Sequence, residues 1–235
     1  VGAGPYAVPY RWRPMTFKVD GQEYTHERAI ATQQTGFTFV ARLRSDLPDA
    51  AKGLLWFGTD DANTAVYIPI YCSVTKVPHE LAVGNGDMNN ISWDANFWVN
   101  NYVANQAYNR YCQMIPDIRR VQSELEQGAL AATEAFEAKV ADLTAAQASA
   151  AAQEIADKWA AKATSDYKAL GDFLLVKFMD GNIKRQDADG SFSRNPYGLP
   201  ASPQYGGYND PRYFRAIVDE TGDRLKVRDV KPQGK

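Results

Sequence analysis

The sequence has no large excess of charge of one sign and no long apolar segment. Its 26 Lys and Arg residues nearly balance 28 Asp and Glu residues, which leaves a formal net charge of −2 over 235 residues. So small a charge indicates no broad electrostatic attraction to nucleic acid or to an anionic membrane. No run of about eighteen apolar residues is present, so the sequence predicts no helix that spans a membrane.

Cysteine and histidine are scarce, with two residues of each. Cys72 and Cys112 lack the C-x-x-C spacing of a zinc or redox site, and His26 and His79 do not complete a zinc-ligand pattern with them. Neither Cys is expected to be a nucleophile, because nothing in the sequence near them predicts a lowered thiol pKa. A disulfide between them stays open, although buried free thiols are the commoner outcome. We expect no metal site and no cofactor.

The short motifs of the common enzyme classes are also missing. The sequence contains no glycine-rich phosphate-binding loop, no zinc-protease motif and no serine nucleophile elbow. The segment Asp187–Gly190 matches the start of a calcium-binding loop, but the loop's last ligand position, normally Glu, is Gly198. We interpret this segment as an ordinary turn.

What is present indicates a folded α+β protein. Apolar residues make up 45% of the chain and charged residues 23%, as in folded globular domains. Residues 1–91 read as antiparallel strands that contribute to a sheet. A hairpin is expected where Asp20-Gly21 separates residues 16–19 from Tyr24, because Asp-Gly favours the positive φ angles of a tight turn. Further strands are expected at residues 29–32, 36–43, 54–58 and 65–70.

Residues 92–183 are expected to form a helical region. The first helix begins near Ser92, a good N-cap, and Pro116 should kink or break it. A second helix is predicted by apolar residues at spacings of three and four from Val121 to Val140. Thr144 and Gln147 match a capping box, so a third helix should begin there.

The last segment, residues 184–235, is expected to be an extended tail. It is dense in Gly, Pro, Asn and Tyr between residues 193 and 211, a composition that makes no core by itself. Weak alternation at residues 213–218 and 225–230 favours a terminal hairpin.

The densest group of uncharged polar side chains lies between two expected strands. Thr32, Gln33, Gln34 and Thr35 offer amides and hydroxyls that can bind the carbonyls or ends of a peptide. Arg28 can bind a carboxylate through two hydrogen bonds. We take these five residues as candidate substrate-binding residues. The alternative, a polar sheet edge with Arg28 in a structural ion pair, stays open.

A second polar group follows the strand at residues 54–58. Asp60, Asp61 and Asn63 are turn-forming residues between two expected strands. We expect them at the tip of a hairpin, exposed to solvent.

Four stretches between Pro9 and Glu126 carry a likeness to a known family. They are Glu27–Phe37, Gly53–Gly58, Val66–Tyr71 and a run from Ser92 to Ile115. In this order they resemble the secreted dipeptidase A family of cysteine peptidases. The helical and tail regions beyond Glu126 resemble it less specifically.

This resemblance implies an N-terminal-nucleophile hydrolase, whose fold is a four-layer αββα sandwich. The nucleophile of such an enzyme is a Cys that processing leaves at the N-terminus. Its thiolate attacks the scissile carbonyl while its own α-amine acts as the base, and water then releases the acyl group. The substrates implied are dipeptides of varied side chain.

The chain departs from this pattern at Val1, which has no side chain that could act as a nucleophile. We expect these residues to be the C-terminal part of a dipeptidase, produced by processing or cloning and inactive alone. The resemblance then puts the catalytic Cys on an upstream N-terminal segment of the same precursor. That segment is the expected partner, and no catalytic residue is assigned to this chain.

A second interpretation stays open, in which the chain is a non-catalytic interaction or peptide-binding module with a helical docking surface. The resemblance also implies export from a bacterial cell, to the periplasm or beyond. The preferred dipeptide and a homo-oligomeric state stay open.

Overall fold

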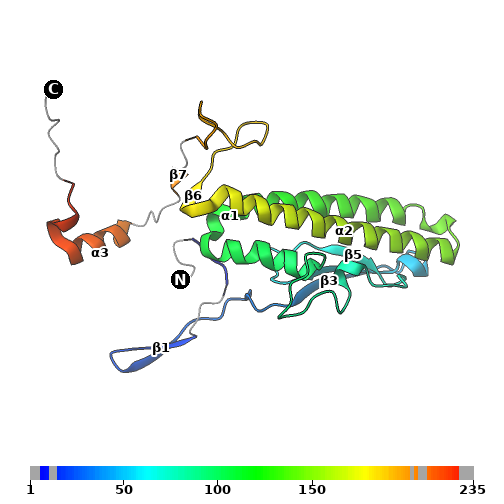
Figure 1. Ribbon diagram of the computed structural model, residues 1–235. Coiled ribbons are helices and arrows are strands. Elements are labelled where there is room, and N and C mark those ends of the chain that lie inside the picture. Colours follow the sequence, from blue (N-terminus) through cyan, green and yellow to red (C-terminus); the bar gives the residue numbers. More distant parts are fainter. Residues whose placement is uncertain (1–5, 11–14, 202–203, 206–210, 228–235) are drawn as a thin grey trace.

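The computed structural model describes residues 6–10, 15–201, 204–205 and 211–227. These residues form a mixed helix and sheet structure, so the predicted α+β class is confirmed (Figure 1). The strands are β1 (Thr16–Val19), β2 (Gln22–Thr25), β3 (Phe37–Leu43), β4 (Gly53–Thr59), β5 (Ile68–Tyr71), β6 (Asn182–Ile183) and β7 (Gln204–Tyr205). The α-helices are α1 (Asn96–Glu137), α2 (Ala145–Phe178) and α3 (Pro211–Thr221).

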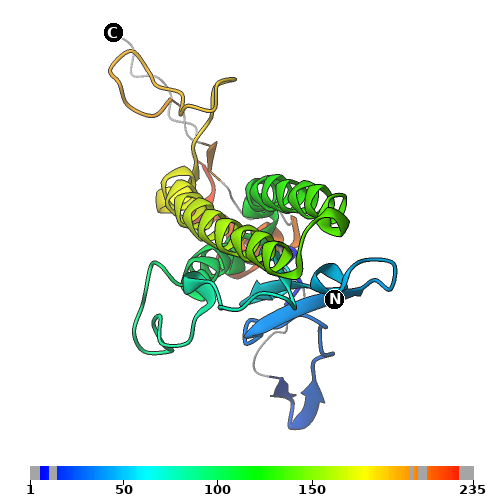
Figure 2. The same ribbon diagram turned by 90° about the vertical axis from the view of Figure 1, so that its right-hand side faces the viewer.

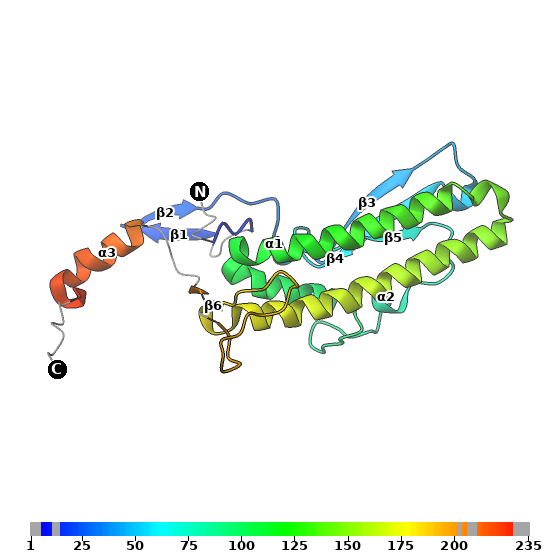
Figure 3. The same ribbon diagram turned by 90° about the horizontal axis from the view of Figure 1, so that it is seen from above.

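The main sheet is antiparallel, with strand order β3-β4-β5. Phe37 pairs with Thr59 at one end of β3 and β4, and Leu43 pairs with Gly53 at the other. The predicted hairpin of β1 and β2 is confirmed, with Asp20 and Gly21 at positive φ in its turn. It projects away from α1 and α2 in both Figure 1 and Figure 3.

The two long helices pack on each other and cover one side of the sheet. Figure 2, which looks along them, shows α1 and α2 side by side with the sheet below. Val99, Val103 and Ile118 of α1 and Tyr167 and Leu174 of α2 are fully buried in their shared core. Each such side chain contributes about 1.5–3 kcal/mol through removal of apolar surface from water. None of the described helices is apolar enough over a sufficient length to cross a membrane.

An ion pair ties the sheet to the end of α1. Arg42 of β3 forms a hydrogen-bonded ion pair with Glu137, and the Tyr71 hydroxyl of β5 donates to the same carboxylate oxygen at 2.7 Å. Burial of its hydroxyl, followed by the negative charge of Glu137, raises the pKa of Tyr71. The Tyr71 hydroxyl therefore stays protonated and keeps donating over the physiological pH range.

The helix boundaries confirm one local prediction and correct two others. The capping box of Thr144 and Gln147 is present at the start of α2. The first helix begins at Asn96 rather than near Ser92. The prediction that Pro116 breaks this helix is wrong, because α1 changes direction six residues earlier. Arg110 has φ and ψ of −145° and 42°, and Pro116 lies inside the helical part that follows.

Three strand predictions also differ from the structure. Residues 29–32 form a loop with one bridge, between Ala31 and Tyr10, instead of a strand. The strand expected at 65–70 begins only at Ile68. The first strand of the expected terminal hairpin is helix α3, and part of the second lies outside the described residues. Helix α3 has an apolar residue at every third or fourth position, and this periodicity outweighs the weak alternation.

Both cysteines are free and exposed, contrary to the expected burial of their thiols. Cys72 follows β5, and its backbone N–H donates to the carbonyl of Gly53, at the start of β4. Cys112 follows the kink in α1, where its N–H donates to the carbonyl of Tyr6. No disulfide joins them.

Gly128 lies where Trp159 of α2 comes closest to α1. A Cβ at position 128 would lie 2.5 Å from Cη2 of the Trp159 ring, which is 8% exposed. We predict that Gly128→Ala lowers the free energy of unfolding by about 1–3 kcal/mol, although Ala by itself favours a helix over Gly by about 1 kcal/mol. Urea denaturation measures the change.

The matched background for this test is Trp159→Phe, whose smaller ring leaves room for a methyl group. In that background Gly128→Ala should be neutral or stabilising. An equal loss of stability in both backgrounds would contradict close packing as the cause.

Candidate functional site

The polar residues singled out in the sequence, apart from Arg28, lie at one end of the main sheet, where β3 begins and β4 ends. Thr59, the last residue of β4, pairs with Phe37, the first residue of β3. The backbone N–H of Asp60 donates to the carbonyl of Gly36 at 2.8 Å. The turn before β3 and the residues after β4 are therefore neighbours, although they are more than twenty positions apart in the sequence.

The segment Thr32–Thr35 forms a hydrogen-bonded turn that leads into β3. The backbone N–H and the hydroxyl of Thr35 both donate to the carbonyl of Thr32, at 3.2 and 2.9 Å. The Thr32 hydroxyl donates to the side-chain oxygen of Gln34. Gln33 is half-buried and makes no hydrogen bond within the described part of the chain. The turn thus presents amide and hydroxyl groups beside Asp60.

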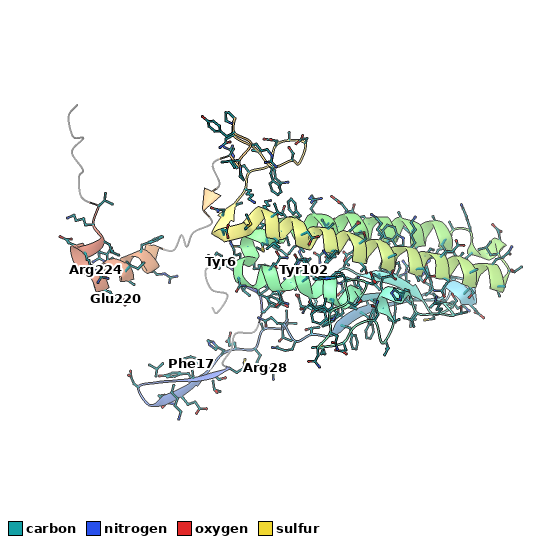
Figure 4. All side chains as sticks on the ribbon, viewed as in Figure 1. Tyr6, Phe17, Arg28, Tyr102, Glu220 and Arg224 are labelled. Carbon is teal, nitrogen blue, oxygen red and sulfur yellow. The ribbon has the colours of Figure 1, made fainter. Side chains whose placement is uncertain are left out.

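Arg28 is not part of this turn's hydrogen bonding. It is exposed near the β1–β2 hairpin, as Figure 4 shows. It has no ion pair with any residue that the structure describes, so the structural ion pair considered for it is not found there.

Asp61 is the best-connected residue of the site, and the prediction that Asp60, Asp61 and Asn63 form a solvated tip is wrong. Asp61 is fully buried. One of its carboxylate oxygens accepts from the Tyr10 hydroxyl at 2.6 Å and from the backbone N–H groups of Asn63 and Thr64 at 2.8 and 3.1 Å. The other accepts from the Thr64 and Tyr108 hydroxyls at 2.6 and 3.3 Å. Five donors compensate for the lost hydration of this carboxylate.

Asp60 is buried beside Asp61, but only one of its two carboxylate oxygens has a hydrogen-bond partner. It is 1% exposed and has a positive φ of 69°, which is uncommon for a residue other than Gly. Asn101 of α1 donates to its Oδ1 at 3.0 Å, whereas its Oδ2 is buried without a partner. Burial raises the pKa of Asp60 to about 7, the Asn101 hydrogen bond opposes that rise, and the nearby charge of Asp61 adds to it. Strain and an unpaired polar atom together are typical of a functional position.

A buried network of uncharged groups joins this end of the sheet to both helices. The Thr59 hydroxyl donates to Oδ1 of Asn96 at 2.7 Å, and Asn100 donates to the same oxygen at 2.8 Å. Asn96 in turn donates to the Thr164 hydroxyl of α2 at 3.1 Å. All four residues are less than a tenth exposed. Because the network links three elements, it fixes the position of the residue that follows Thr59, which is Asp60.

The sequence contained a signal for this network that was not used. Asn96 and Asn100 lie four positions apart on α1 and so share one helix face, and Asn101 follows directly. Amide side chains on a buried helix face require polar partners. Thr59 and Thr164 supply them for Asn96 and Asn100, and Asp60 supplies one for Asn101.

The chemical capacity of the site is to bind and orient polar groups. It offers a neutral or ionised carboxyl at Asp60 and the hydroxyls and amides of the turn. The thiol of Cys72 is not part of it, because Cys72 lies at the opposite end of β4. Within the described ranges no three His, Cys, Asp or Glu side chains are grouped so that they could hold a metal ion.

Asp60 makes the stability of the protein depend on pH. Its pKa is about 7 in the folded protein and about 3.9 when unfolded, so the folded state retains a proton that the unfolded state loses between these values. The stabilisation is complete below about pH 4 and is lost as the pH rises through 7. We predict that the unfolding free energy of the wild type, measured relative to that of Asp60→Asn, falls by about 2–4 kcal/mol between pH 4 and pH 8. Urea denaturation across this range measures it.

Asp142→Asn is the matched control, since Asp142 is an exposed carboxylate in a short turn between the helices. The difference in unfolding free energy between the wild type and Asp142→Asn should stay nearly constant between pH 4 and pH 8. Parallel pH profiles for wild type and Asp60→Asn would contradict a raised pKa at Asp60.

Comparison with protein-family models gives a match to the first part of the chain. Residues 8–124 match the model of peptidase family C69, a segment that contains the main sheet, the turn before β3, Asp60, Asp61 and the first part of α1. The search of curated proteins gave no match. Through this segment, the chain belongs to peptidase family C69.

Proposed function

We propose that the chain is the C-terminal part of a cysteine dipeptidase whose nucleophile is an N-terminal Cys on another segment of the same precursor. The Cys thiolate attacks the scissile carbonyl, the amine of the substrate's second residue leaves, and water releases the acyl group. Membership of a peptidase family supports the hydrolytic part of this proposal. Processing of the precursor and export from a bacterial cell belong to the same proposal.

The observation that carries the proposal is an apolar sheet face that the described residues leave exposed along β3. We define the open face as Phe37, Phe39, Leu43, Leu55 and Phe57, which lie on one side of β3 and β4 by their register. Phe37, Phe39 and Leu43 are 59%, 55% and 80% exposed, and the Phe37 and Phe57 rings stack with centroids 5.7 Å apart. The opposite side of β4, with Leu54 and Trp56, packs against the helix cores.

An exposed apolar face of this kind requires a partner surface. A second sheet with an apolar inner face fits it, because stacked sheets bury alternate residues of both. We propose that the segment bearing the Cys supplies that second sheet, which gives the αββα sandwich of an N-terminal-nucleophile hydrolase. The helices α1 and α2 are then the outer layer on this side.

The candidate site has a defined place in this arrangement. Asp60 and the turn Thr32–Thr35 lie at the sheet end next to the open face, so a Cys at the matching end of the second sheet faces them. We propose that the turn and Asp60 line the dipeptide pocket and hold the polar ends of the substrate. Arg28 is proposed to approach the substrate carboxylate from the edge of the pocket.

The proposal predicts that the pure chain Val1–Lys235 hydrolyses no dipeptide. An active preparation from the intact gene should contain a second polypeptide that begins with Cys, and intact-mass analysis detects it. Iodoacetamide should abolish dipeptide hydrolysis and label that N-terminal Cys, because a thiolate is the reacting form.

The control is the double variant Cys72→Ser and Cys112→Ser, which removes both exposed thiols of this chain. It should retain full activity and the same sensitivity to iodoacetamide. Turnover of a dipeptide by the isolated chain, or loss of activity in the double variant, would overturn the proposal.

The rival function is a non-catalytic interaction module with a helical docking surface. It requires no second sheet, so the chain alone should then be a monomer with no tendency to associate. The exposure of Phe37, Phe39 and Leu43 favours the dipeptidase instead. Sedimentation of the isolated chain, with and without the Cys-bearing segment, separates the two.

A further inference from the structure

A cavity of about 330 Å³ adjoins the candidate site. Thr59, the residue before Asp60, lines it from the sheet, and Phe97 and Trp98 line it from the start of α1. The segment 80–88, part of the loop between β5 and α1, forms the remaining wall. The cavity therefore lies where a molecule held at the sheet end would extend toward α1.

The loop wall is fixed in place by side-chain hydrogen bonds. Asn85 donates to the carbonyls of His79 and Asp94, both at 3.1 Å, and accepts from the Ser92 hydroxyl at 2.6 Å. The indole N–H of Trp98 donates to the carbonyl of Asp87 at 3.1 Å. The Asn85 contacts hold the loop to itself between residues 79 and 94, and the Trp98 hydrogen bond joins it to α1. The wall of the cavity is therefore formed without a ligand.

The inner surface of the cavity is apolar. Phe97 and Trp98 form an edge-to-face pair with ring centroids 5.8 Å apart, and both side chains are half-buried. Met88 lines the same cavity from the loop. Aromatic rings and a flexible thioether bind apolar groups of varied shape.

The charge on the cavity wall is entirely negative. Glu80 and Asp87 are its charged lining residues among those described, and no Lys, Arg or His joins them. The carboxylate of Asp87 is already used, since it accepts from the backbone N–H groups of Asn89 and Asn90 at 2.7 and 2.9 Å. Glu80 is half-buried and has no hydrogen-bond or ion-pair partner in the described structure. It also lines a neighbouring cavity of about 340 Å³, which puts it at the border of the first.

We propose that this cavity binds the N-terminal residue of a dipeptide, with an apolar side chain against Phe97, Trp98 and Met88 and the α-ammonium group on Glu80. The inference rests on the proposed dipeptidase function and names the substrate class that the site selects. An α-ammonium group is separated from its side chain by one carbon, so it suits an acid at the border of an apolar cavity. A Lys side chain carries its charge at its far end and would bring that charge among the aromatic rings.

The test measures binding to the intact gene product, with its N-terminal Cys replaced by Ala where one is present, so that no turnover occurs. The probes are phenylalanyl-alanine and its N-acetylated form, in which an uncharged amide replaces the ammonium group. The reporter is the Trp98 indole N–H signal in ¹H–¹⁵N spectra, identified by its loss in Trp98→Phe. Phenylalanyl-alanine should shift this signal saturably, with a Kd on the order of 1 mM, and the acetylated form should bind about 5- to 20-fold more weakly.

Two variants separate the contribution of the ammonium group from that of the apolar side chain. Glu80→Gln should weaken binding of phenylalanyl-alanine by about 5- to 20-fold and leave that of the acetylated form unchanged. Phe97→Ala should weaken both probes. Glu124→Gln is the control, because Glu124 is an exposed carboxylate on α1 paired with Arg120, and it should change neither. Helical circular dichroism verifies that each variant is folded.

The outcomes are distinct from those of the hydrolysis experiment. Three results would overturn this inference. The Trp98 signal could show no saturable shift, the two probes could bind equally well, or Glu80→Gln could weaken the binding of both probes equally. Dipeptide hydrolysis by the intact gene product together with any of these results would leave the proposed function standing. Ammonium-dependent binding without an N-terminal Cys in the native protein would overturn the dipeptidase and keep the binding site.

Discussion

The bend of α1 at Arg110 is the constraint on which the arrangement of the helices depends. The Arg110 guanidinium donates to the carbonyls of Phe178, Gly181 and Asn182 at 3.1, 3.2 and 3.4 Å. These groups lie where α2 ends and its carbonyls lose their helical partners. The same guanidinium lies 5.3 Å from the centre of the Phe178 ring. One side chain therefore fixes the bend of one long helix to the end of the other.

The bend lets both parts of α1 pack on α2. Val99 and Val103 before the bend and Ile118 after it are fully buried in one core with Leu174 of α2. The part before the bend also brings Asn96 and Asn101 to the end of the sheet, where they contact Thr59 and Asp60. A helix that continued straight from residue 96 to residue 137 could not place both of its parts against α2. The polar site is thus a consequence of how the helices pack.

Local signals in the sequence predicted part of the local structure, although the helix start near Ser92 and the strand at residues 29–32 were wrong. The capping box of Thr144 and Gln147 and the hairpin at Asp20-Gly21 were predicted correctly, because each depends on residues a few positions apart. The environment of Asp61 was not predicted, because Tyr10 and Tyr108 reach it from positions about fifty residues away on either side. A turn-forming Asp has the same local sequence whether it meets water or two buried hydroxyls.

The two faces of the sheet also differ through contacts with residues distant in the sequence. Apolar side chains on β4 that meet the helices are satisfied within the chain, as Leu54 is at 1% exposure. On the other side, Leu55 and Phe57 of β4 are half-buried, and Phe39 of the neighbouring β3 is 55% exposed. The strand pattern carries apolar residues on both sides, which is the pattern of a strand buried on both faces. A strand with apolar residues on both sides, next to a strained and half-satisfied Asp60, supports the proposal that a second layer completes the site.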